Sequence, residues 1–132
     1  MVRIFKTRYF SRWALKAGIH DKALTQAIDE MILGLSDANL GGSVFKKRLP
    51  APGRGKRGGF RTLIATRSEQ YYFFVFGFEK NKRSNVTTTE LQALQALAIE
   101  LLSLTEHQII AAVEDGAIQE IMYDAENKKR HS

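Results

Sequence analysis

A basic, glycine-rich stretch from Lys46 to Arg61 holds the residue types that could do chemistry. It reads Lys-Lys-Arg-Leu-Pro-Ala-Pro-Gly-Arg-Gly-Lys-Arg-Gly-Gly-Phe-Arg. Glycine lets a backbone approach a phosphate closely, while arginine and lysine donate charge-assisted hydrogen bonds to its oxygens. The stretch is therefore a candidate phosphate-binding loop. A solvated, flexible basic loop explains the same composition equally well.

RNA is a phosphate ligand on which cations can act without a metal ion. Its 2′-hydroxyl is the nucleophile, so a protein need only orient it, remove its proton, stabilise the phosphorane and protonate the leaving oxygen. A lysine crowded by other cations loses proton affinity. This makes Lys56 and Lys80 candidate proton shuttles.

Other catalytic sites find little support in the sequence. Cysteine is absent, which excludes a thiol nucleophile and a thiolate metal site. His20, His107 and His131 are scattered, and no carboxylates stand at ligand spacing, so we expect neither metal nor cofactor. The residues around Gly53 do not match the phosphate-binding loop of nucleotide hydrolases.

The net charge of +6 is concentrated in one part of the chain. The segment from Lys46 to Arg83 carries eleven lysines and arginines against two glutamates, so the remainder is net acidic. Such a patch favours a polyanionic partner. The longest apolar run, Tyr71 to Phe78, is too short to span a bilayer. We expect a cytoplasmic protein that makes no membrane contact.

Apolar spacing and capping residues predict the elements that must position these cations. In chain order they are a strand near Val2 to Phe5, helices from Thr7 to Gly18 and from Asp21 to Leu35, a strand beginning at Val44, a hairpin of Phe60 to Arg67 with Tyr71 to Phe78, a Thr87-capped helix reaching Leu102, a Thr105-capped helix, and a short strand within Ile118 to Tyr123.

This order predicts an α+β fold, with an N-terminal strand and two helices packed on an antiparallel sheet, followed by C-terminal helices. The helices are expected on one face of the sheet. Aromatic and β-branched residues throughout Tyr71 to Phe78 nevertheless predict a central strand covered on both faces. Residues 1–132 are expected to form a single domain, with a core of about 1–103, a helical extension of about 104–123 and a frayed tail of 124–132.

Two motifs resemble the RelE/ParE superfamily of bacterial toxins, and within it a HigB-like, RelE-like branch. The first is the block from Phe45 to Arg61. The second is Phe76 to Asn85, followed by the threonine-capped helix. The resemblance covers roughly Val2 to Leu102. It implies a RelE-like fold and the toxin of a type II toxin-antitoxin system.

The resemblance also implies an activity and a set of site residues. The activity is metal-independent, ribosome-dependent cleavage of mRNA that leaves cyclic phosphate ends, with 16S rRNA contacts and a cognate antitoxin, expected to be a helix-turn-helix protein. Arg54, Lys56 and Arg61 would bind the scissile phosphate, and Lys80 and Arg83 would line the site. RNA-binding residues would be Lys46, Lys47, Arg48, Arg57 and Lys82.

Two departures keep alternatives open. Several relatives have a tyrosine or histidine near the end of the last strand, where this chain reads Phe76-Gly77-Phe78, so the proton donor is unidentified. A non-catalytic nucleic-acid-binding module and a gyrase-inhibiting ParE-like toxin are therefore alternative functions. The second departure is the material after Leu102, which could cover the sheet, form a homodimer or dock the antitoxin.

Overall fold

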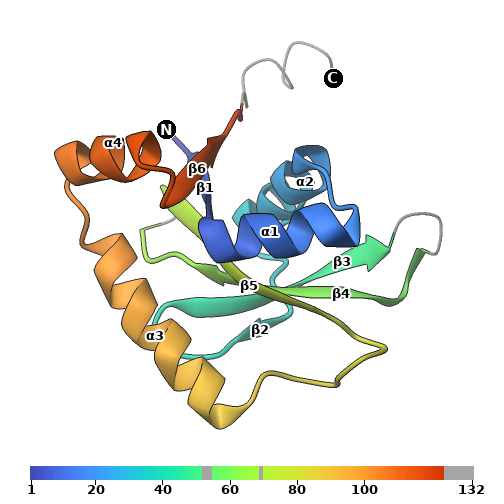
Figure 1. The fold of residues 1–132 in the computed structure, drawn as a ribbon. Helices are drawn as coiled ribbons and strands as arrows, with labels where there is room; N and C mark the ends of the chain where they lie inside the picture. Colours follow the sequence, from blue (N-terminus) through green and yellow to red (C-terminus); the bar gives the residue numbers. More distant parts are fainter. Residues whose placement is uncertain (52–54, 69, 124–132) are drawn as a thin grey trace.

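The computed structural model describes residues 1–51, 55–68 and 70–123, with the backbone alone for 55–58. Along these residues, one strand and two helices precede four strands, which two helices and a last strand follow (Figure 1). The elements are β1 Arg3–Thr7, α1 Arg8–Ala17, α2 Asp21–Ile32, β2 Ala38–Asn39, β3 Val44–Ala51, β4 Gly55–Ala65, β5 Tyr71–Glu79, α3 Thr88–Leu102, α4 Glu106–Glu114 and β6 Ile118–Ile121.

The strands form one mixed sheet in the order β2-β3-β4-β5-β1-β6. The α+β class and the β4–β5 hairpin are confirmed. The sheet is antiparallel except between β1 and β5, which run parallel with Arg3 opposite Tyr71. Parallel neighbours need a long connection. Here the segment from α1 to β4 forms the connection between β1 and β5.

Apolar side chains form clusters on both faces of the sheet. Tyr72 and Phe74 of β5 pack with α1 and α2, whereas Phe73 and Val75 pack with α3 and α4. The expectation of helices on one face only is therefore wrong, as Figure 1 also shows. Because β5 is apolar on both sides, it needs cover on both. Its predicted position as a central, doubly covered strand is confirmed.

Most of the basic stretch forms strands instead of a loop. β3 extends to Ala51, and β4 begins at Gly55, its partner across the hairpin. Gly59 permits a close approach of these strands, since a Cβ at this position would lie 2.4 Å from the Leu49 carbonyl oxygen. Of the predicted loop, residues 52–54 lie outside the described part of the chain.

Threonine caps begin three of the helices, and those at Thr87 and Thr105 confirm the prediction from the sequence. Thr7 caps α1, while Thr87 and Thr105 each form a full capping box on α3 and α4. The second helix ends at Ile32, earlier than predicted. The two-residue strand β2 was not predicted, and it pairs with β3 through a tight turn.

Residues after Leu104 add both a helix and a strand to the fold. β6 pairs antiparallel with β1 at the edge of the sheet. The guanidinium of Arg3 joins this edge together, with nitrogen atoms 2.8 Å from Glu106 and 2.9 Å from Glu120 carboxylate oxygens. In the described ranges, no single helix is long and apolar enough to cross a membrane; α3 and α4 meet that test only as a pair, bent by 113°.

Candidate nucleic-acid interface

Two arginines lie side by side on the sheet face that α3 partly covers. Arg48 of β3 is directly opposite Arg61 of β4, and Arg61 is opposite Phe78 of β5. Directly opposed residues on neighbouring strands project to the same face. Phe78 belongs to the apolar cluster beneath α3, which identifies that face. We call Arg48 and Arg61 the arginine pair.

The arginine pair places two positive charges together, and no carboxylate of the described residues neutralises them through a salt bridge. Partial burial, with repulsion from Arg48, lowers the pKa of Arg61. Asp37 accepts a hydrogen bond from the Arg48 backbone N–H. The negative charge of Asp37 raises the pKa of Arg61, but by less than burial and Arg48 lower it. An anion beside both guanidiniums would relieve their repulsion and accept their hydrogen bonds.

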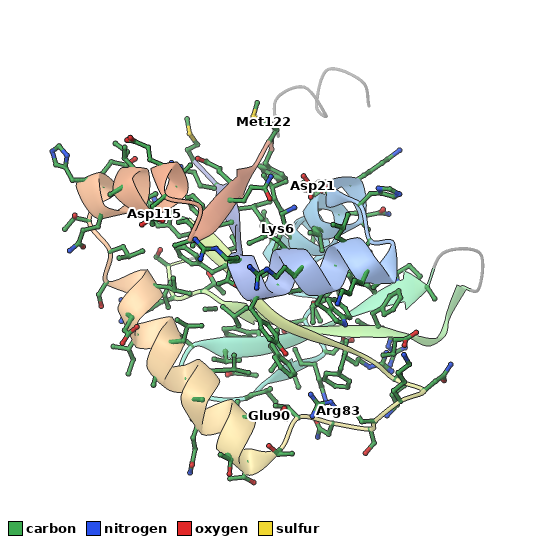
Figure 2. All side chains as sticks on the ribbon, viewed as in Figure 1. Lys6, Asp21, Arg83, Glu90, Asp115 and Met122 are labelled. Atoms are coloured by element: carbon green, nitrogen blue, oxygen red, sulfur yellow. The ribbon has the colours of Figure 1, made fainter. Side chains whose placement is uncertain are left out.

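Arg83 extends this surface beyond β5. Its guanidinium carbon lies 5.1 Å from the ring centre of Phe76 and 5.3 Å from that of Phe78. Glu90 holds it through two hydrogen bonds of 2.7 and 3.0 Å (Figure 2). The Arg83 guanidinium, helped by the Thr87 backbone N–H, lowers the pKa of Glu90 to about 2. Arg83 is thus a positioned, neutralised cation, unlike the arginine pair.

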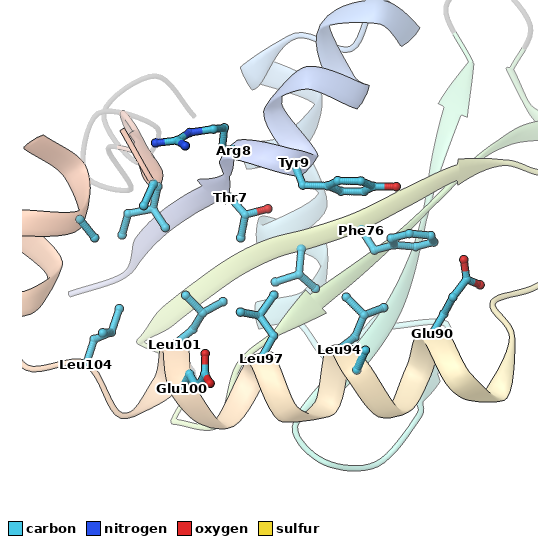
Figure 3. A pocket seen from close by; sticks show the side chains of 15 residues that line it. Thr7, Arg8, Tyr9, Phe76, Glu90, Leu94, Leu97, Glu100, Leu101 and Leu104 are labelled. Atoms are coloured by element: carbon cyan, nitrogen blue, oxygen red, sulfur yellow. The ribbon is translucent and has the colours of Figure 1, made fainter. Parts of the chain in front are cut away.

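Tyr9, in the first turn of α1, also contacts Phe76. The two rings are almost parallel, at an interplanar angle of 4° with centres 5.9 Å apart (Figure 3). Tyr9 is 62% exposed, and its hydroxyl forms no hydrogen bond with the described residues. We call Tyr9 and Phe76 the aromatic stack.

Tyr9, Phe10, Trp13 and Ala14 recur at spacings of three and four, which predicts that all four lie on one apolar stripe of the first helix. Tyr9 was therefore not predicted as a site residue. The structure buries Phe10 and Ala14, with Ala17 packed beside them. These residues recur at spacings of four and three and mark the centre of the buried stripe, with Trp13 also packed against the cluster. That spacing leaves Tyr9 at its margin and is the signal that could have identified an exposed aromatic residue.

Neighbouring lysines of β3 point to opposite faces. Lys46 shares the face of Arg48 and is partly exposed. Lys47 is only 5% exposed, and its Nζ lies 2.6 Å from Glu30 Oε1 and donates to the Leu35 carbonyl at 3.0 Å. Lys47 therefore fixes α2 on the sheet. This position does not fit the RNA contact expected of it.

The turn after β5 carries two more of the predicted cations. The Lys80 backbone N–H donates to the Gly59 carbonyl at 3.0 Å, so the turn begins beside the strand that carries Arg61. The Lys80 Nζ lies 3.4 Å from the Ser84 carbonyl oxygen. Lys82 is exposed and pairs with Glu79 at 3.0 Å. Both lysines thus follow Phe78, the β5 residue opposite Arg61, within four residues along the chain.

Three predicted site residues lie wholly or partly outside the described part of the chain. Arg54 lies outside the described residues, as do the side chains of Lys56 and Arg57. The backbone of the last two belongs to β4 and leads toward Arg61. Within the part of the chain that the structure describes, no three histidine, cysteine or acidic side chains could together hold a metal ion.

An apolar groove with a volume of about 620 Å³ lies beside the aromatic stack (Figure 3). Leu94, Leu97 and Leu101 of α3 form one wall, and residues of β1, α1, β5, α4 and β6 and of their connections contribute the remainder. Both rings of the aromatic stack line this groove, and Phe78, two residues along β5 from Phe76, is opposite Arg61.

Comparison with known proteins agrees with this architecture. A family model described as the RelE toxin of the RelE/RelB toxin-antitoxin system matches residues 2–121. A search among curated proteins gave no significant match. The matched range runs from the strand before α1 through β6, and so includes the arginine pair, the aromatic stack and the C-terminal strand. The chain belongs to the RelE toxin family.

Proposed function

We propose that this chain cuts mRNA on the ribosome as the toxin of a type II toxin-antitoxin system. Family membership supports the toxin role, and with it a cognate antitoxin as partner. The observation that carries the proposed cleavage is the arginine pair, in which two adjacent guanidiniums lack a carboxylate partner among the described residues. A scissile phosphate is the kind of anion that such a site would accept.

The proposed chemistry is transesterification by the substrate's own 2′-hydroxyl. The hydroxyl oxygen attacks the adjacent phosphorus, the bond to the 5′-oxygen breaks, and a cyclic phosphate and a 5′-hydroxyl result. Arg48 and Arg61 would stabilise the negative charge that develops on the phosphorane oxygens. The hydroxyl proton must leave and the 5′-oxygen must gain one. Lys56 and Lys80 remain the proposed groups for these transfers.

The other predicted cations would surround the arginine pair. Arg54 would join the arginine pair at the phosphate, and Arg83 would hold the aromatic side of the site. Lys46, Arg57 and Lys82 would contact ribosomal RNA around it. Lys46 is partly exposed on the face of Arg48, and Lys82 is exposed in the turn after β5, which suits both to such contacts.

Induction in growing bacteria tests the proposal. The wild-type chain is compared with Arg48→Ala/Arg61→Ala and with Arg12→Ala/Lys16→Ala, which removes two exposed charges from α1. We expect wild type and the α1 control to stop growth and to create new mRNA 5′ ends carrying hydroxyls. The arginine-pair variant should lose these ends by about 100-fold or more, since a charge-stabilising donor is worth about 10²–10³ in rate.

Each other outcome points to a different function. Growth arrest without new mRNA ends contradicts cleavage, and relaxed plasmid supercoiling would then identify gyrase inhibition. RNA binding with neither arrest nor cleavage would indicate a non-catalytic binding module. Equal cleavage by the arginine-pair variant and the α1 control would remove the arginine pair from the mechanism.

A further inference from the structure

We propose that Tyr9 binds a nucleobase, which stacks on the exposed face of its ring while a backbone phosphate of the same RNA strand lies at the arginine pair. This inference rests on the proposed function, since it takes single-stranded RNA as the ligand. It assigns a base-binding residue to α1, an element that the sequence-based site did not include.

The aromatic stack is built as a platform. Phe76 is 7% exposed and belongs to the core beneath α3, so its ring is fixed. Tyr9 lies parallel to that ring, while Arg83 lies 5.1 Å from the same ring centre. Phe76 therefore supports one face of Tyr9, and the 62% exposure leaves the other available. A preorganised ring loses little conformational entropy when a ligand stacks on it.

The position of the stack relative to the arginine pair points to a nucleotide ligand. Phe76 and Phe78 are two residues apart on β5, and Arg61 is directly opposite Phe78. Alternate residues along a strand are separated by about 7 Å. The Tyr9 ring centre lies a further 5.9 Å from that of Phe76, and Arg61 lies on the strand next to β5, about 4.8 Å away. A few linked nucleotides can cover this path, with one phosphate on the guanidiniums and one base on the phenol ring.

Single-stranded RNA suits this combination better than a protein partner does. Proteins bind unpaired bases by stacking them on aromatic rings beside a cationic track for the backbone. A protein surface would need carboxylates for the arginines and an apolar group for Tyr9 at the same spacing. Single-stranded RNA carries regularly spaced anions and flat rings along one strand.

The test compares two ligands of equal charge, a fluorescent ten-nucleotide single-stranded RNA and a spacer oligomer with the same phosphates but no bases. The chain is purified as wild type, Tyr9→Leu, Tyr9→Phe and Arg48→Ala/Arg61→Ala. Leucine keeps an apolar contact with Phe76 and removes the ring, whereas phenylalanine removes the hydroxyl alone. Thermal unfolding confirms that each variant is folded.

We expect Tyr9→Leu to weaken RNA binding by about 5-fold or more, since stacking on one aromatic ring is worth about 5- to 150-fold. The same variant should bind the spacer oligomer as wild type does. Tyr9→Phe should keep wild-type affinity for both ligands, and the arginine-pair variant should lose affinity for both.

Three results would overturn base stacking. They are unchanged RNA binding by Tyr9→Leu, an equal loss for RNA and spacer oligomer, and a wild-type chain that binds neither. A loss in Tyr9→Phe as large as in Tyr9→Leu would also contradict it and would instead implicate the hydroxyl. Tyr9-dependent RNA binding without new mRNA ends in cells would refute the proposed cleavage and leave the base-binding role standing.

Discussion

Glu90 connects the start of α3 to the aromatic stack through its side-chain carboxylate and its backbone N–H. Its carboxylate accepts two hydrogen bonds from Arg83 and one from the Thr87 backbone N–H, and its own N–H donates to the Thr87 hydroxyl. The same residue therefore closes the capping box of α3 and holds Arg83 beside Phe76. Protonation of Glu90 would weaken the helix start and the Arg83 ion pair together.

The pKa of Glu90 predicts how stability responds to acid. Its folded value of about 2 lies below the usual 4.5, so the charged form stabilises the fold. That stabilisation is full above about pH 4.5 and is lost as pH falls toward 2. Glu90→Gln should be less stable than wild type at pH 7, with a smaller further loss between pH 5 and 2.5. Urea unfolding at a series of pH values measures this.

Glu114→Gln is the matched control for this acid titration. Glu114 is exposed at the end of α4 and has no ion pair with the described residues. It should follow the wild-type stability curve in acid. Parallel curves for wild type and Glu90→Gln would show that the Glu90 ion pair contributes nothing to acid sensitivity.

At the scale of elements, the basic stretch shows what the sequence could predict and where it failed. Lysines and arginines at consecutive positions hide the alternation of β3, so the stretch from Lys46 to Arg61 was interpreted as a candidate loop. The structure makes Lys47 a buried partner of α2 and leaves Lys46 on the opposite face. Composition identified a phosphate-binding surface, but only strand register shows which cations share it.

The other elements were predictable because their signals are local. Thr87 and Thr105 lie at capping positions that need no tertiary context. The parallel pairing of β1 with β5 and the cover of α3 on the second face are long-range features. Tyr9 reaches Phe76 only through that pairing, which is why the aromatic stack was not predicted.

The alternation of β3 predicts opposite effects for its two lysines. Lys47→Ala should cost about 1–3 kcal/mol of unfolding free energy, because Glu30 and the Leu35 carbonyl lose a shared donor. Lys46→Ala should change stability by less than about 0.5 kcal/mol. It should instead reduce RNA affinity. The slope of log binding constant against log salt concentration should become shallower by about 1, as expected for the loss of one phosphate contact.

Chemical unfolding and RNA titration at several salt concentrations measure both lysine variants. If Lys47→Ala weakens RNA binding more than Lys46→Ala does while remaining fully stable, the face assignment of β3 is incorrect.

At the scale of the whole molecule, the C-terminal segment completes both apolar clusters. Ile109 and Ile118 pack beneath α3, whereas Ile121 packs on the opposite face with α1 and α2. β6 also covers the edge of β1, and Glu106 and Glu120 bind Arg3. The boundary expected near residue 103 thus separates the first part of the chain from C-terminal residues that pack against it on both faces of the sheet.

A chain ending at Leu104 should therefore fail to unfold cooperatively. It loses three isoleucines that are at most 3% exposed, worth about 1.5–3 kcal/mol each, which together approach the 5–15 kcal/mol stability of a typical domain. In the full chain, Ile118→Ala should cost about 2–4 kcal/mol. Ile110→Ala, at a 46% exposed position of α4, should cost less than about 1 kcal/mol. Calorimetry of the four chains measures this, and a cooperative, wild-type transition in the shortened chain would instead show that residues 1–104 form an independent core.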